Sequence, residues 1–255
     1  MTENPFTKLT GLAAHCQERL DHDLSAWQEN YLAQGGRIHC ARGCANCCNL
    51  AVETTLPEAM RIASLLKVGQ IEDLQSYIDR LLPALSQITD LKSYLRLHRQ
   101  KIGPCPFLTE EGACGIYADR PLACRALLST RNSDWCAVDF ADLHPLEKDA
   151  FMSSLDREVV AFPTHYAAVP QQLATELEGE LNHTMQESFG CRVSGNLPLL
   201  VWLELKHNFS ALLTESIPAT RERLSSLRLN LPFILRLADS ENATSATPQP
   251  HGDSR

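Results

Sequence analysis

The sequence lacks an uninterrupted apolar run of about 18 residues, the length that a membrane-spanning helix needs. Its most apolar window, residues 196–205, is shorter than that and contains Glu204. The first residues also lack the charged lead and apolar stretch of a secretory signal. We therefore expect a cytoplasmic protein with no membrane segment.

An excess of positive charge is missing as well, since 23 Lys and Arg face 31 Asp and Glu and the net charge is −8. A protein that binds nucleic acid without sequence preference needs a basic face, so we expect no nucleic-acid partner. No phosphate-binding loop and no dinucleotide-binding glycine pattern is present. Internal repeats and alternating strands and helices are also absent, which excludes the common α/β architectures.

What is present is an ordinary soluble composition, with 44% hydrophobic and 21% charged residues in a chain of 255. Apolar residues recur mostly at steps of three and four, the helical period. The sequence predicts a mostly α protein with little β structure and two irregular cysteine-rich loop regions organised by metal. It divides into an N-terminal helical segment (1–36), a cysteine-cluster domain (37–140), a C-terminal helical region (141–237) and a polar, disordered tail (238–255).

Several elements can be placed within these segments. Residues 51–56 read as a short strand, and Pro57-Glu58 opens a helix because proline and glutamate suit a first helical turn. Pro83 should stop that helical stretch. Further helices are predicted at about 86–101, 145–162, 169–189, 197–215 and 219–237.

Eight of the ten cysteines fall in two groups, and the first group is Cys40, Cys44, Cys47 and Cys48. The Cys44-x2-Cys47 step is a spacing at which a tight turn brings two thiolates to one ion. Adjacent side chains such as those of Cys47 and Cys48 diverge. The doublet therefore favours two neighbouring sites, or one cluster large enough to take ligands from both sides.

The second group is Cys105, Cys114, Cys124 and Cys136, in a stretch rich in glycine and proline. Gly112 and Gly115 allow the sharp turns that ligand loops need. Eight thiolates divide into two sets of four, and clustered cysteines in a reducing compartment are more often metal ligands than disulfides. Three nearby cations would offset the thiolate charge: Arg42, Arg120 and Arg125.

The remaining candidates are weaker. Cys16 and Cys191 stand alone in the sequence and are interpreted as ordinary buried cysteines. His39, beside Cys40, is the histidine best placed to substitute for a thiolate, although a surface role is the simpler interpretation. No catalytic residue can be named.

The two cysteine groups form one extended pattern. It consists of Cys40-x3-Cys44-x2-Cys47-Cys48, followed by Cys105-Pro106-Phe107-Leu108 and Cys114-x-Ile116-Tyr117-x2-Arg120-Pro121-x2-Cys124-Arg125. This pattern resembles the CxxCxxCC family of YkgJ-like cysteine cluster proteins. The resemblance spans about Cys40 to Cys136. It implies a domain that chelates zinc or iron. The first gap has three residues where the family pattern has two, which makes Cys40 the least certain ligand of the eight.

Three functions remain open from the sequence. The first is a non-catalytic module in which two four-thiolate zinc sites hold a platform for a protein partner. The second is an iron–sulfur protein in electron transfer or metal handling. The third is an iron–sulfur-dependent protein lysine methyltransferase, which rests on the family resemblance, since some longer relatives are linked to lysine methylation of flagellin. The oligomeric state cannot be inferred.

Overall fold

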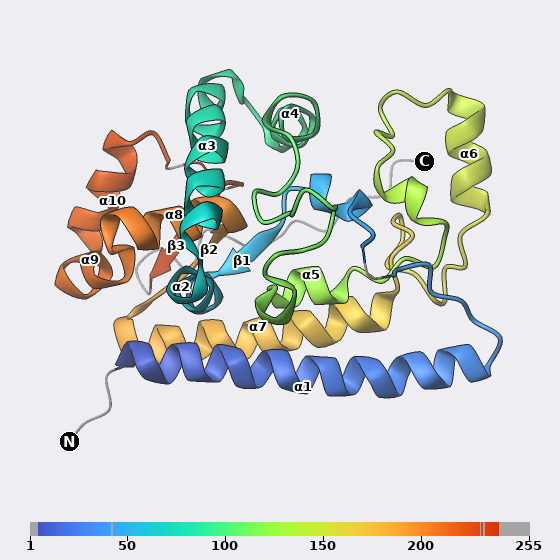
Figure 1. Cartoon of the computed structure of the whole chain (residues 1–255), viewed down its shortest axis with the longest axis horizontal. Coiled ribbons are helices and arrows are strands. Elements are labelled where there is room, and N and C mark those ends of the chain that lie inside the picture. Colours follow the sequence, from blue (N-terminus) through green and yellow to red (C-terminus); the bar gives the residue numbers. More distant parts are fainter. Residues whose placement is uncertain (1–4, 42, 230, 232, 240–255) are drawn as a thin grey trace.

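The computed structural model describes residues 5–41, 43–229, 231 and 233–239 (Figure 1). The predicted mostly α class with little β is confirmed, because helices dominate the described chain and its strands form one small sheet. The α-helices are α1 (Pro5–Ala33), α2 (Leu56–Leu65), α3 (Val68–Ala84), α4 (Leu91–Leu97), α5 (Leu122–Ala126), α6 (Pro145–Ser153), α7 (Ala168–Phe189), α8 (Leu197–His207), α9 (Phe209–Glu215) and α10 (Ile217–Ser226). The strands are β1 (Glu53–Thr55), β2 (Cys191–Asn196) and β3 (Leu235–Asp239).

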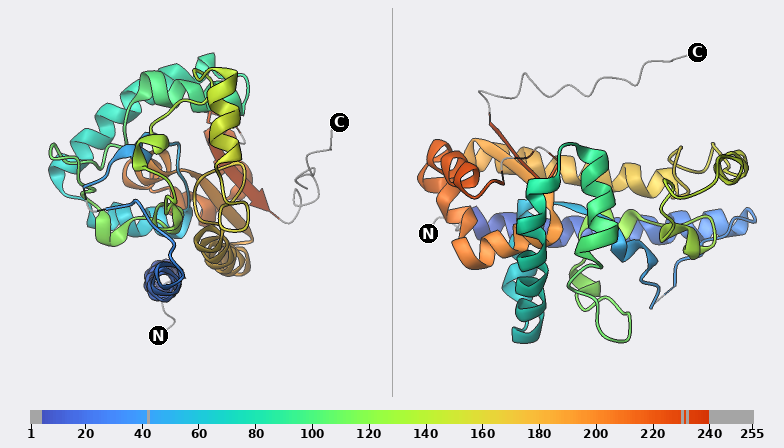
Figure 2. Two further views of the ribbon diagram at one scale, coloured as in Figure 1. Left: turned by 90° about the vertical axis from the view of Figure 1, so that its right-hand side faces the viewer. Right: turned by 90° about the horizontal axis from the view of Figure 1, so that it is seen from above.

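Two long helices, α1 and α7, lie side by side along one face of the molecule and run in opposite directions (Figures 1 and 2). Buried positions recur along α1 at steps of three or four, so one face of the helix is apolar: Leu9, Ala13, Cys16, Leu20 and Leu24. The facing positions of α7 have the same spacing: Ala174, Leu177, Leu181 and Met185. The short helix α5 packs against both long helices, which places its residues above their apolar seam.

The sheet joins the middle of the chain to its C-terminal part. β2 is the central strand, and it pairs antiparallel with β1 on one side and β3 on the other. Gly195 of β2 has no room for a side chain, because a Cβ atom there would lie 2.5 Å from the Ile234 carbonyl oxygen. The largest buried core unites residues 56–116 with residues 185–235 around this sheet.

The start of α2 follows the sequence prediction. Pro57 lies in the first turn, and Thr55 and Glu58 form a reciprocal capping box. Pro83 lies in the last turn of α3, which ends one residue later. The helix predicted at 86–101 is shorter in the structure and ends in a π-helical turn, His98–Ile102.

The C-terminal region departs from the prediction in four places. The helix expected over 197–215 is two helices, because Asn208 adopts a left-handed conformation (φ 48°) between α8 and α9. The helix expected over 145–162 ends at Ser153. The helix expected over 219–237 ends at Ser226, and β2 was not predicted.

The final strand, β3, takes in residues 238 and 239, which the sequence assigned to the tail. The rest of the predicted tail, 240–255, lies outside the described residues. Among the described helices, none combines the length and the apolar character that a membrane crossing would require. The proposed division into four segments stays a prediction.

Candidate metal centre

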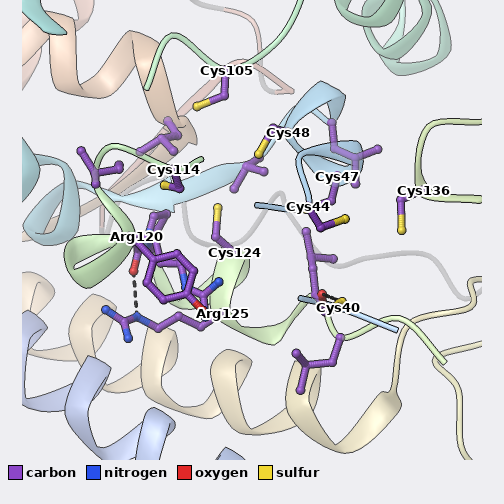
Figure 3. A pocket seen from close by; sticks show the side chains of 18 of the residues that line it. Cys40, Cys44, Cys47, Cys48, Cys105, Cys114, Arg120, Cys124, Arg125 and Cys136 are labelled. Atoms are coloured by element: carbon purple, nitrogen blue, oxygen red, sulfur yellow. Dashed lines mark hydrogen bonds between the residues drawn. The ribbon is translucent and has the colours of Figure 1, made fainter. Parts of the chain in front are cut away.

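All eight clustered cysteines line one cavity of about 450 Å³ (Figure 3). They come from five separate stretches of chain, in the order Cys40 and Cys44 (loop after α1), Cys47 and Cys48 (the 3-10 turn Asn46–Asn49), Cys105 and Cys114 (loop after α4), Cys124 (α5) and Cys136 (the 3-10 turn Ser133–Cys136). Each carries a free thiol, as do Cys16 and Cys191. The fold thus brings together two groups that lie more than 50 residues apart in the sequence.

A pair of tight turns arranges the first group. Gly43 has a φ of +87°, which only glycine adopts readily, and the Cys44 N–H donates to the Ala41 carbonyl at 3.1 Å. The following 3-10 turn is closed by the Cys48 N–H, which donates to the Ala45 carbonyl at 2.9 Å. A hydrogen bond between the Cys47 and Cys48 side chains, together with burial, raises the pKa of the Cys47 thiol.

The loop that carries Cys105 and Cys114 folds back on itself and docks on the first group. The Cys105 N–H donates to the Cys48 carbonyl at 2.9 Å, which joins the two groups directly. Within the loop, the Thr109 N–H donates to the Ala113 carbonyl and the Gly115 N–H to the Phe107 carbonyl. Gly112 has a φ of +76°, as the predicted sharp turn requires, whereas Gly115 has no left-handed conformation and instead permits a close approach, since a Cβ atom there would lie 3.0 Å from the Phe107 carbonyl oxygen.

Helix α5 holds Cys124 at the cavity, and a buried carboxylate fixes its first turn. Glu58 is fully buried, and its Oε1 accepts a hydrogen bond from the Leu122 N–H at 2.8 Å. Its Oε2 accepts from the Thr54 hydroxyl and from the N–H and hydroxyl of Thr55. One carboxylate therefore caps the start of α2 and also receives the N-terminus of α5, which suits its negative charge.

Cys40 and Cys136 lie at the opposite side of the cavity, beside residues that sequence reasoning missed. The Ser129 N–H donates to the Cys40 sulfur at 3.2 Å. Nε2 of the buried His165 lies 3.3 Å from the Cys136 sulfur, and Tyr166 also hydrogen-bonds to that thiol. No spacing signal marks this histidine, because it lies 29 residues beyond Cys136 and reaches it only through the fold.

A different buried histidine, His98, lines the cavity itself. The Tyr77 hydroxyl lies 2.8 Å from Nε2 of His98, and Nδ1 of His98 lies 3.2 Å from the Asn49 carbonyl. The carbonyl can only accept, so Nδ1 carries the proton and Nε2 accepts from the tyrosine. His98 begins the π-helical turn, a type of element found often at functional sites. His39, the histidine that the sequence singled out, is not part of the cavity lining.

Burial keeps most of these thiols protonated. It raises the pKa of Cys105 to about 12, raises that of Cys124 well above the ordinary value, and raises those of Cys40, Cys114 and Cys136 to a smaller extent. Neighbouring thiolates add to each shift. A bound cation reverses this effect, because a metal ion favours the thiolate form and its binding releases the protons.

The arginines that the sequence associated with the cluster have different roles. Arg125 is buried, and its guanidinium is hydrogen-bonded to Asp21 of α1 and to the carbonyls of Ala118 and Arg120. Arg120 lies over the ring of Tyr117, with its guanidinium carbon 4.2 Å from the ring centre. Its charge lowers the pKa of Cys47, Cys114 and Cys124 against the effect of burial. Arg42 lies outside the described residues.

The donor set of the cavity fits a thiophilic metal. It offers eight sulfur donors, and soft thiolates select zinc and iron–sulfur clusters over magnesium or calcium. In the part of the chain that the structure describes, no three histidine, cysteine, aspartate or glutamate side chains already converge on one point as metal ligands. The thiols surround the cavity, so coordination requires side-chain rotation or closure of the two loops.

Comparison with known proteins agrees with this chemistry. Residues 39–142 match the family model CxxCxxCC, described as a putative zinc- or iron-chelating domain. The match includes all eight cysteines of the cavity and covers less than half of the chain. No curated protein and no solved structure matches the sequence.

Proposed function

Because residues 39–142 are a CxxCxxCC domain, we propose that the protein binds zinc or iron with the eight cysteines of the cavity as ligands. The observation that carries the proposal is the convergence of eight free thiols from five stretches of chain on one cavity. Cysteines used only as small buried hydrophobes would be distributed through the core, as Cys16 and Cys191 are.

We further propose two centres of four thiolates each. The inner set is Cys48, Cys105, Cys114 and Cys124, and the outer set is Cys40, Cys44, Cys47 and Cys136. Figure 3 supports this division, since the inner set lies toward α5 and the loop of Cys105 while the outer set lies toward Cys136.

Two kinds of contact support the assignment of the doublet. The Cys105 N–H bonds to the Cys48 carbonyl, which favours Cys48 as the fourth member of the inner set. Cys44 and Cys47 both raise the pKa of Cys40 and Cys136, so those four side chains are electrostatic neighbours. Cys47 also acts on Cys105, Cys114 and Cys124, which indicates that the two centres lie next to each other.

Metal analysis of protein purified without oxygen tests the proposal. About two zinc ions per chain in colourless protein would support two closed, structural sites, because each takes four thiolates. Brown protein with iron and acid-labile sulfide would support an iron–sulfur centre. Protein that holds neither metal after supplementation of the growth medium with both would contradict the proposal.

Cysteine variants separate two centres from one cluster. We expect Cys48→Ser and Cys124→Ser each to lose the inner metal, and the two together to lose no more than either alone. Cys47→Ser combined with Cys124→Ser should lose all metal. A reversed pattern would exchange the roles of Cys47 and Cys48, and complete loss from every single variant would mean a single cluster. Cys16→Ser is the matched control.

The use of the metal depends on its identity. Closed zinc sites would make the cysteine loops a rigid platform for a protein partner, and an iron–sulfur centre would support electron transfer. An iron–sulfur-dependent protein lysine methyltransferase is the alternative that the family resemblance suggests. Its test is methyl transfer from S-adenosylmethionine to a protein lysine, lost in Cys44→Ser. We also propose a cytoplasmic location, where ten unpaired thiols stay reduced.

A further inference from the structure

The cavity extends beyond its thiols. One end is formed by Asp21, Leu24, Ser25 and Gln28 of α1, none of which carries sulfur. Arg125 ties the chain at Ala118 and Arg120 to Asp21, so the Tyr117–Arg120 turn lies against this same end. We name it the α1 end.

The cavity that includes the α1 end has the size of a small-molecule site. The volume of the whole cavity, about 450 Å³, falls within the range of ligand pockets, roughly 300–1,000 Å³. Two metal ions, each given the volume of a water molecule, about 30 Å³, would occupy a small part of it. Leu24 and Ile116 supply apolar wall, and the exposed Asp21 and Ser25 leave this end open to solvent.

Arg120 is a cation at this end, and its side chain has an N–H donor without a hydrogen-bond partner in the described chain. Within the described chain, its Nε is buried without a hydrogen-bond partner, and its guanidinium enters no ion pair with a carboxylate. The Tyr117 ring holds one face of the guanidinium, which leaves the edge with its N–H donors for a ligand. Arg125, by contrast, has all three of its nitrogens engaged.

A planar guanidinium edge matches a carboxylate, which accepts two parallel hydrogen bonds from it. A phosphate dianion fits less well, because the thiolates of a metal-loaded cluster would make this region negative and a second negative charge on the ligand would add repulsion. The apolar wall calls for an apolar body attached to the acid.

We propose that the α1 end binds a small organic monocarboxylate, with Arg120 as its anion-binding residue, next to the thiol-bound metal. This proposal rests on the proposed function only for the neighbouring metal. The bound acid would lie beside the inner set, since Arg120 acts electrostatically on Cys114 and Cys124.

Isothermal titration calorimetry on the full, metal-loaded chain tests the proposal, with hexanoate, hexanol and inorganic phosphate as probes at constant ionic strength. We expect hexanoate to bind more tightly than the other two. Arg120→Gln should weaken hexanoate binding by roughly ten- to hundredfold, the effect of losing hydrogen bonds to a charged group. Arg120→Lys should retain part of the affinity, because lysine keeps the positive charge and lacks the paired N–H donors that bind both carboxylate oxygens.

Arg61→Gln is the control, because Arg61 pairs with Asp119 at 2.7 Å close by and does not line the cavity. Equal binding of hexanol and hexanoate, no binding of hexanoate, or an unchanged affinity in Arg120→Gln would each overturn the proposal. Metal content measured on the same samples separates the two failures. Protein that keeps its metal and ignores hexanoate refutes this site alone, whereas protein that holds no metal refutes the proposed function.

Discussion

Replacement of Glu58 by glutamine should destabilise the protein strongly, although the two side chains have nearly the same size and shape. The carboxylate accepts four hydrogen bonds in full burial, one from Leu122 and three from Thr54 and Thr55. A glutamine amide has one accepting oxygen, so its NH2 group must face at least one of these donors. A hydrogen bond to a charged group contributes about 1.5–3 kcal/mol, and the remaining bonds lose their charge assistance. We expect the free energy of unfolding to fall by about 2–4 kcal/mol.

Urea unfolding followed by far-ultraviolet circular dichroism measures this change. Glu147→Gln is the matched control, because Glu147 has the same capping-box position in α6 but is exposed. Glutamine is also accepted at that position, so the control should change stability by less than about 0.5 kcal/mol. The Glu58→Gln variant should remain less stable than the Glu147→Gln variant after a chelator removes any metal. Equal effects of the two substitutions would refute the reasoning.

Other substitutions test other parts of the structure. Gly195→Ala should lower the free energy of unfolding by about 1–3 kcal/mol, because the new methyl group meets the backbone of the neighbouring strand, whereas Gly179→Ala in the open interior of α7 should raise it by about 0.5–1 kcal/mol. Burial, with help from Glu58 and Glu53, raises the pKa of Glu178 to about 8. Since the unfolded carboxyl ionises near pH 4.3, wild-type stability should fall as pH rises from about 4.5 to 8, and Glu178→Gln should remove that loss in urea titrations across this range. Cys16, whose pKa burial raises to about 11, should resist alkylation by iodoacetamide in the native protein, and Cys16→Ala should leave metal content unchanged. Rapid alkylation of Cys16, or a Glu178→Gln variant with the wild-type pH dependence, would contradict these expectations.

The helical parts of the fold were predictable where a single face is buried. The buried positions of α1 and α7 follow the helical period, and the expected helix at 169–189 agrees with α7 within one residue. The sequence failed where a local conformation depends on distant partners. β2 falls in the gap between the helices predicted at 169–189 and 197–215, where no element was predicted, and it becomes a strand because β1 and β3 pair with its two edges. The break at Asn208 has a different, local cause: the residue adopts a left-handed conformation, and the Glu204 side chain accepts hydrogen bonds from the N–H and hydroxyl of Ser210 six residues later.

In the site, too, residues with a local sequence signal could be predicted and residues placed by distant contacts could not. Cysteine spacing alone identified the eight cysteines among the residues that line the cavity, because thiols clustered so closely carry their own signal. Tyr77 and His98, which line the cavity, and His165, which contacts Cys136, carry no such signal, because each comes from a separate helix or loop. The contrast between Arg120 and Arg125 was also beyond the sequence, because it depends on Asp21 of a helix about 100 residues earlier.

The boundaries of the family match and the boundaries of the cooperative structure do not coincide. Residues 39–142 contribute only β1 to the sheet, and the strand that pairs with it, β2, begins at Cys191. The α5 residues Leu122 and Ala126 likewise lie in a core built with α1 and α7, both outside the match. A fragment cut at these boundaries would expose the edge of β1 and the underside of α5. The cysteine segment is therefore not an independently folding domain in this chain. In another protein it would need a strand to pair with β1 and helices to pack under α5.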